Sequence, residues 1–206
     1  MEREIFLPEI EARINSQPPG SVFVTSDFAD IASSKTASRA LQRLEAEGTL
    51  RRVLRGVYER PEYSEFLKEN IAASPDKVAR AIARNHGWHI VPSGDTALNM
   101  LGLSTQVPSV WLYVSDGPYR KYQYERVTLQ FKRTAQKELT SMSDKSALVI
   151  QALKALGNER ASDEVLHQIA FLLTDREKQA MLEEAQHTTA WILQLLKRIA
   201  AQGVNE

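Results

Sequence analysis

The stretch that decides the fold of the N-terminal part reads SSKTASRALQRLEAEG and spans residues 33–48. Its apolar side chains recur at the i, i+3, i+4 and i+7 spacing of one helical face: Ala37, Ala40, Leu41 and Leu44. Ser33-Ser34 offers hydroxyl oxygens to the first free amides, and Gly48 suits the left-handed position that ends a helix. We therefore predict an amphipathic helix here, with its apolar face buried.

The residues before this helix predict two more helices. Residues 3–14 carry apolar side chains at near-helical spacing, and the run QPPG that follows ends this first helix because proline lacks an amide donor. A short apolar stretch then leads to Thr25 and Ser26, either of which can cap a second helix around Phe28. The helix of residues 33–48 is thus the third.

A β-hairpin is predicted directly after the third helix. Residues 49–60 read TLRRVLRGVYER, in which Val53, Val57 and Tyr58 are strand formers and Gly56 permits a turn. Three helices followed by a hairpin is the element order of a winged helix-turn-helix domain, which we assign to residues 1–62.

The rest of the chain, residues 63–206, is expected to form an α+β domain. A short helix is predicted around Phe66-Leu67, and the part up to about residue 142 mixes helix and strand. Residues 143–202 have helical periodicity with breaks near Gly157-Asn158 and Thr174-Asp175, which predicts a helical C-terminal bundle. The fold class is therefore α+β with an N-terminal winged helix-turn-helix.

Composition excludes several classes of function. The chain has no cysteine, which rules out disulfide scaffolds, thiolate zinc sites and cysteine nucleophiles. The acidic start is not a signal peptide, and no apolar run approaches the roughly 20 residues that a membrane-spanning helix needs. We expect a cytoplasmic protein without a membrane partner.

The charge is balanced overall but segregated locally. The 26 basic residues equal the 26 acidic ones, so the chain has no general affinity for polyanions. Residues 1–33 hold two basic and six acidic side chains, a net charge of −4, whereas residues 34–60 hold seven basic and three acidic ones, a net charge of +4. The third helix and the hairpin are therefore the cationic part of the first domain.

The pattern on the third helix fits the major groove of DNA. Lys35, Arg39 and Arg43 are spaced by four and lie on one face, opposite the apolar stripe. The hairpin arginines extend this surface toward the backbone or minor groove. We predict that double-stranded DNA is bound by Lys35, Thr36, Ser38, Arg39, Gln42, Arg43, Arg51, Arg52 and Arg55.

Two alternatives compete with DNA binding. Arginines on a helix often form no more than a solvated face, and winged helices also dock other proteins. The combination of a capped helix, a basic hairpin and an acidic preceding segment favours DNA. The alternative function is a protein-protein adaptor, or a regulator that uses the winged helix as a docking module.

A second cationic segment covers residues 117–133 and reads GPYRKYQYERVTLQFKR. Aromatic side chains beside cations can stack on bases or contact a partner. Equally, the segment can be an edge strand with tyrosines packed on one face and lysines guarding the edge. The candidate partner surface consists of Tyr119, Arg120, Lys121, Tyr122, Arg126, Lys132 and Arg133.

The other candidate sites do not predict a metal-binding, phosphate-binding or catalytic function. His86 and His89 flank Trp88 but have no third ligand for a metal. The turn at residues 93–96 is better explained as a helix cap than as a phosphate site, because it lacks a P-loop lysine and glycine array. Without clustered carboxylates or a nucleophile-base pair, we expect no enzyme, no metal and no cofactor.

Two segments resemble a known family. Residues 21–61, which contain RALQRLEAEGTLRRVLRGVY, resemble the N-terminal winged helix of the AbiEi-type antitoxins of type IV toxin-antitoxin systems. Residues 91–118, VPSGDTALNMLGLSTQVPSVWLYVSDGP, are similar to the antitoxin domain of that family, and the resemblance covers about residues 20–135. It implies an abortive-infection antitoxin that represses its own operon and counteracts a nucleotidyltransferase toxin encoded beside it, with or without direct contact.

Overall fold

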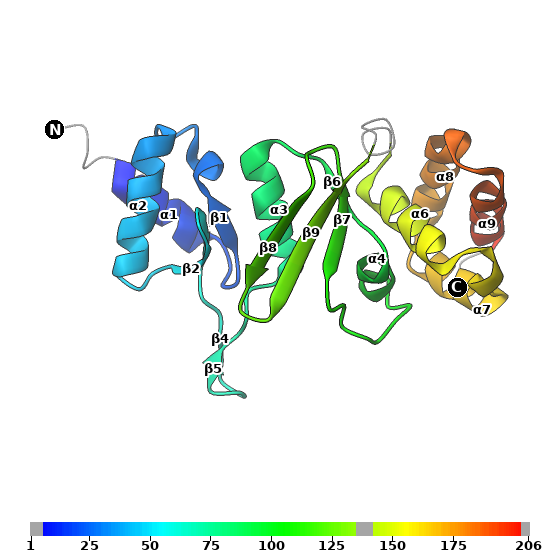
Figure 1. The fold of residues 1–206 in the computed structure, drawn as a ribbon, viewed down its shortest axis with the longest axis horizontal. Coiled ribbons are helices and arrows are strands. Elements are labelled where there is room, and N and C mark those ends of the chain that lie inside the picture. The colour runs from blue at the N-terminus through cyan, green and yellow to red at the C-terminus, as the bar shows by residue number, and fades with distance from the viewer. Residues whose placement is uncertain (1–5, 135–141, 203–206) are drawn as a thin grey trace. The chain divides into compact units, whose positions relative to one another are not determined.

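The computed structural model describes residues 6–134 and 142–202 and is a mixed α+β structure, which confirms the predicted fold class (Figure 1). The chain divides into two units, Met1–Trp88 and His89–Glu206. The boundary predicted at residue 62 falls earlier than this division, because the helix at 75–86 contacts the first strand and joins the first unit.

The first unit contains the predicted helices and hairpin together with a second, smaller hairpin. Its elements are α1 (Phe6–Ser16), β1 (Val22–Val24), the 3-10 helix η1 (Thr25–Phe28), α2 (Ser34–Ala46), β2 (Arg51–Leu54), β3 (Val57–Glu59), β4 (Tyr63–Ser64), β5 (Glu69–Asn70) and α3 (Pro75–His86). The strands β1, β3 and β2 form an antiparallel sheet in that order, with Phe23 opposite Tyr58. This order is compatible with a winged helix-turn-helix.

Helix α2 forms as its sequence predicts. Its apolar stripe is buried together with residues of α1, β1 and β3. The Ser33 hydroxyl accepts a hydrogen bond from the Thr36 amide at 3.3 Å, and Gly48 ends the helix with a φ of +80°. The buried stripe fixes the rotation of α2, so its opposite face points to solvent.

Two local predictions in the first unit are wrong. The second helix is only the four-residue turn η1, where the Asp27 carboxylate accepts a hydrogen bond from the Val24 amide at 2.9 Å. The short helix expected at Phe66-Leu67 is instead the turn of the β4–β5 hairpin, in which Tyr63 pairs with Asn70. Both segments are too short for periodicity to decide their structure.

The second unit begins with a four-stranded sheet. Its elements are β6 (Ile90–Pro92), α4 (Asp95–Met100), β7 (Trp111–Ser115), β8 (Arg120–Tyr124) and β9 (Val127–Arg133). The strand order is β6-β7-β9-β8, with β7 and β9 parallel and the other pairs antiparallel. Strand β8 is therefore at the edge of the sheet.

The helical part has the two predicted breaks. It comprises α6 (Asp144–Leu156), η2 (Asn158–Arg160), α7 (Asp163–Phe171), α8 (Asp175–Glu184), η3 (Ala185–His187) and α9 (Ala190–Ala201). The side chains of Ser143, Ser162 and Thr174 cap α6, α7 and α8. Buried leucines and isoleucines of these helices share one core with α4.

Among the described residues, no helix is both long and apolar enough to cross a membrane.

The cap of α8 predicts a measurable pH dependence of stability. A hydrogen bond from Lys145, followed by bonds from the Thr174 amide and hydroxyl, lowers the pKa of Glu177 from 4.5 to about 2. A carboxyl whose pKa is lower in the folded state stabilises the fold above its unfolded pKa, and this contribution is lost as the pH falls from about 4.5 toward 2. Glu177→Gln should lower the melting temperature at pH 6, and the difference from the wild type should shrink on acidification.

Thermal unfolding of both proteins between about pH 6 and pH 2.5 checks this expectation. Glu159→Gln is the control, because Glu159 is an exposed carboxyl in η2 that accepts no hydrogen bond from another described residue. A Glu177→Gln difference that stayed constant across this range would show that the cap is not linked to protonation.

Candidate nucleic-acid interface

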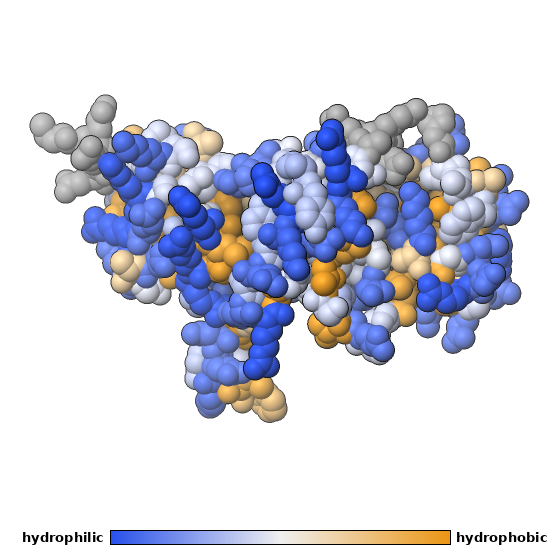
Figure 2. All heavy atoms as spheres, in the orientation of Figure 1, coloured by the Kyte–Doolittle hydropathy of each residue, from blue (hydrophilic) through white to orange (hydrophobic). Residues whose placement is uncertain are grey.

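Helix α2 presents its predicted polar face to solvent. Lys35, Arg39, Gln42 and Arg43 are exposed, and Thr36 and Ser38 are half-buried beside them. Because Ala37, Leu41 and Leu44 are fully buried, the cations and the apolar stripe occupy opposite sides of the helix. Figure 2 shows hydrophilic side chains over this helix.

The cations of this face are available to a ligand to different degrees. Lys35 and Arg39 have no ion-pair partner within residues 6–134 and 142–202. Arg43 donates from Nε to the Glu47 carboxylate at 2.8 Å, but both side chains are exposed. An exposed pair of this kind contributes little to stability, so Arg43 can exchange Glu47 for a phosphate.

Two of the uncharged residues take part in local hydrogen bonds. The Thr36 hydroxyl lies 3.0 Å from the Ser33 hydroxyl and belongs to the N-terminal cap. The Gln42 amide nitrogen donates to the Ser38 hydroxyl at 3.2 Å, which holds the amide along the helix surface. Gln42 keeps its carbonyl oxygen and one N–H for a base edge, whereas Thr36 has mainly a capping role.

The hairpin contributes two exposed arginines. Arg52 lies on β2, and Arg55 occupies the two-residue turn before β3. Gly56 has a φ of +77°, a conformation that favours glycine, so the turn stays tight. Neither arginine has an ion-pair partner in the described parts of the chain. Arg52 and Arg55 are therefore positioned as the wing residues of the proposed interface.

Arg51 has a different role from the one that its sequence position predicts. Its Nε donates to the Glu59 carboxylate at 3.1 Å, and a second nitrogen donates to the Ile71 carbonyl at 2.8 Å. Only 2% of the Glu59 side chain is exposed, so this buried carboxylate needs the positive charge of Arg51 to offset the cost of its desolvation. We therefore assign Arg51 to the fold and not to the DNA-binding set.

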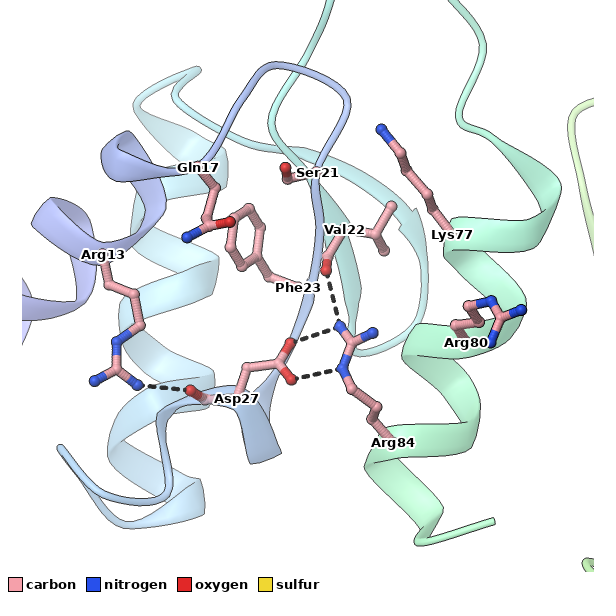
Figure 3. Close-up of a pocket in the computed structure, with 9 residues that line it drawn as sticks. All are labelled: Arg13, Gln17, Ser21, Val22, Phe23, Asp27, Lys77, Arg80 and Arg84. Atoms are coloured by element: carbon pink, nitrogen blue, oxygen red, sulfur yellow. Dashed lines mark hydrogen bonds and ion pairs between the residues drawn. The ribbon is translucent and has the colours of Figure 1, made fainter. Parts of the chain in front are cut away.

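A cleft on the first unit is lined by cations that the sequence analysis did not select. Its volume is about 340 Å³, and Figure 3 shows Lys77 and Arg84 reaching from α3 toward β1. Arg84 donates to both Asp27 oxygens at 2.9 and 3.1 Å and to the Val22 carbonyl at 3.1 Å. Lys77 donates to the Gly20 carbonyl at 3.0 Å. These cations already have acceptors, so the cleft is a structural contact between α3 and β1.

The sequence held a signal for this contact. Lys77, Arg80 and Arg84 are spaced by three and four on α3, which also places them on one helical face, as the spacing of four does for the cations of α2. Two of these cations pair with a carboxylate: Arg80 with Asp76, four residues earlier on α3 itself, and Arg84 with Asp27 of η1. Arg13 likewise pairs with Asp30 at 2.7 Å. Two of the six acidic side chains counted in residues 1–33, Asp27 and Asp30, are thus paired within the fold.

The second cationic segment forms two strands, the edge strand β8 and the inner strand β9, so the edge-strand interpretation holds for β8. Tyr124 is buried and half-buried Tyr122 packs edge-on against Phe131, with ring centres 5.9 Å apart. Burial raises the pKa of Tyr122, against an opposing effect of Arg120. Tyr122 and Tyr124 therefore pack into the core of the sheet and are not free to stack on bases.

The cations of this segment remain exposed. Tyr119 precedes β8 and is also exposed, while Lys121 and Gln123 alternate with the tyrosines and lie on the other face of the strand. No ion pair to another described residue involves the five cations of the segment: Arg120, Lys121, Arg126, Lys132 and Arg133. The structure thus retains the cationic part of the predicted partner surface and removes Tyr122 from it.

The remaining candidate sites are structural. His86 stacks on Trp88 with ring centres 4.5 Å apart, and His89 contacts Asp116 through its amide and ring nitrogens. The Thr96 hydroxyl accepts a hydrogen bond from the Leu112 amide at 2.7 Å, so the turn at residues 93–96 anchors a strand. In the described ranges, no three His, Asp or Glu side chains are grouped as metal ligands.

The buried pair on the hairpin gives a stability prediction. Arg51→Ala leaves the Glu59 carboxylate without its main partner and should cost roughly 3 kcal/mol in the free energy of unfolding. Arg52→Ala, a neighbouring exposed arginine, should change it by less than about 0.5 kcal/mol. Urea denaturation of the two variants measures both values. Equal stability of Arg51→Ala and the wild type would contradict the structural role of Arg51.

Comparison with known proteins gives a family but no described function. No curated protein matches the chain. The sequence model of one protein family, described as a family of unknown function (DUF6088), matches residues 9–181, which includes α2, the hairpin and the edge strand β8. Since this match covers most of the chain, the protein belongs to the DUF6088 family.

Proposed function

We propose that this protein is a transcriptional autorepressor that binds its own operator, and that it is also the antitoxin of a type IV toxin-antitoxin system. The single observation that carries the DNA-binding part is the exposed cationic face of α2, formed by Lys35, Arg39 and Arg43. Arg52 and Arg55 add cations on the hairpin that follows. In this proposal the first unit acts as a winged helix-turn-helix.

The geometry of α2 supports insertion into the major groove. Its buried stripe holds it on the core, and its outer face offers guanidinium groups that can bind guanine bidentately and a lysine that can neutralise phosphate. Gln42 adds an amide that can read adenine. The wing arginines contact the backbone or the minor groove beside it.

A docking module for proteins fits this surface less well. Protein interfaces are enriched in aromatic and other apolar side chains at their centre. Among the described residues, the strongly exposed large apolar side chains lie elsewhere than on α2 and the β2–β3 hairpin. The adaptor function therefore lacks a supporting observation on this face.

The antitoxin part rests on the resemblance of residues 21–61 and 91–118 to AbiEi-type antitoxins. In the structure, residues 91–118 include β6, α4 and β7. The proposal places the protein in the cytoplasm, gives it no catalytic activity or cofactor, and makes a nucleotidyltransferase toxin its functional counterpart. The exposed cations of β8 and β9 are proposed to contact a partner, whether nucleic acid or toxin.

Operator binding can be tested by mobility shift on DNA from upstream of the gene. Arg39→Ala combined with Arg43→Ala should weaken binding by roughly a hundredfold, because each lost base contact costs about 1–3 kcal/mol. The matched control is Arg176→Ala with Lys197→Ala, which removes two exposed cations from α8 and α9. Equal affinity of the double variant and the control would reject the proposed interface.

Salt dependence separates DNA binding from protein docking in the same experiment. Each phosphate contact contributes a slope of about −0.9 to the logarithmic dependence of the binding constant on salt. Removal of Arg52 and Arg55 should therefore reduce the slope by about 2 if both contact phosphates. A binding constant that is insensitive to salt would favour the adaptor.

The proposed role of the cations on β8 and β9 can be tested by charge reversal. Lys121→Glu with Lys132→Glu should reduce operator affinity if the surface contacts DNA, or reduce protection of cells that express the adjacent toxin if it serves the antitoxin function. The fold should tolerate both changes because the two side chains are exposed. If operator affinity and protection both remained at the wild-type level, this segment would not be a partner surface.

A further inference from the structure

The β4–β5 hairpin has no part in the proposed DNA interface. We call residues 62–71 the arm, and its turn, Glu65–Lys68, the tip. Figure 1 shows the arm as a separate hairpin that extends away from the sheet of the first unit, and Figure 2 shows hydrophobic atoms at its end. The arm therefore needs an explanation of its own.

The tip exposes large apolar side chains. Phe66 is 93% exposed and Leu67 is 57% exposed, while Tyr63 on β4 and Ile71, directly after β5, are 53% and 39% exposed. Four large apolar residues within nine positions thus face water. Exposed apolar side chains that gather in one short segment usually mark an interaction surface, whereas isolated exposed residues do not.

The arm is ordered before it meets any partner. At the tip, the Lys68 amide donates to the Ser64 carbonyl at 2.8 Å, and the Leu67 amide donates to the Ser64 hydroxyl at 3.1 Å. At the base, the Ile71 amide donates to the Glu62 carbonyl, and Arg51 donates to the Ile71 carbonyl, both at 2.8 Å. Since the apolar residues are already held in place, binding costs little additional conformational entropy.

The charges of the arm indicate what it can bind. It carries Glu62, Glu65 and Glu69 against the single cation Lys68, so it repels phosphate and cannot extend the DNA interface. The tip itself is neutral, because Glu65 and Lys68 stand on either side of Phe66 and Leu67 and pair at 2.9 Å. A neutral tip with one charge of each sign at its ends is complementary to a second copy of itself.

We propose that two copies of the chain associate through their arms, tip to tip, around a two-fold axis. Such an axis between Phe66 and Leu67 reverses the order of the tip residues in the partner. It places Phe66 against the partner's Leu67 and Glu65 against the partner's Lys68, and both contacts occur twice. The interface is small and the association is therefore weak, in the range of transient complexes.

Sedimentation equilibrium of the full chain between about 1 and 300 µM tests this proposal without DNA. The wild type should show a concentration-dependent monomer-dimer equilibrium. Phe66→Ser with Leu67→Ser should raise the dissociation constant at least about tenfold. The control, Phe171→Ser with Leu172→Ser, removes an exposed apolar pair at the end of α7 and should leave the constant unchanged.

Two results would overturn the proposal. One is a wild type that stays monomeric over the whole range. The tip would then be expected to bind a pocket on a different protein and not a second copy of the chain. The other is an equal dissociation constant for the wild type and the tip variant. The operator mobility shift is a separate measurement, so failure of dimer formation is distinguishable from failure of DNA binding.

Charge exchange tests the two-fold arrangement directly. Glu65→Lys places two lysines opposite each other in a symmetric dimer, and Lys68→Glu places two glutamates opposite each other, so each variant alone should dissociate at least about tenfold more readily. A mixture of the two variants restores opposite charges at both contacts and should form a heterodimer with near wild-type affinity. If the mixture is as weak as either variant alone, the tip-to-tip contact is excluded.

Discussion

The first unit depends on one buried carboxylate. Glu59 lies at the end of β3, and only 2% of its side chain is exposed. Such a charge is tolerated only with a partner, and Arg51, directly opposite on β2, supplies it. The same guanidinium bonds to the Ile71 carbonyl at the base of the arm. One ion pair thus joins β2 to β3, and its arginine also holds the C-terminal end of the arm.

This ion pair shows why only part of the candidate nucleic-acid interface could be predicted from the sequence. The apolar face of α2 follows from spacing alone, so the exposure of Lys35, Arg39 and Arg43 was predictable too. Charge counting treated Arg51, Arg52 and Arg55 alike, because nothing local reveals that Glu59 is buried. Burial is a property of the assembled sheet, and only the structure separates the anchoring arginine from the exposed ones.

Other departures have the same cause. The segment at Phe66-Leu67 has two adjacent apolar residues, which suggested a helix, but the hairpin forms through pairing between Tyr63 and Asn70 across the tip. The boundary at residue 62 missed α3 because its basic residues find their acceptors, such as Asp27, more than fifty positions earlier. By contrast, the alternation within β8 is a local pattern of period two, and one of the two alternatives open from the sequence, an edge strand with its tyrosines packed on one face, agrees with the structure.

The contact between α3 and β1 has a consequence for synthesis on the ribosome. Strand β1 can pair with β3 once Glu59 has been made, but the residues that give Asp27 its arginine and cover β1 follow only with α3, which ends at His86. At about 5–20 residues per second, the ribosome needs a few seconds to add them. During that interval the proposed helix-turn-helix of the nascent chain lacks its final support, so its completion is timed by translation of a helix that lies outside the proposed DNA-binding surface.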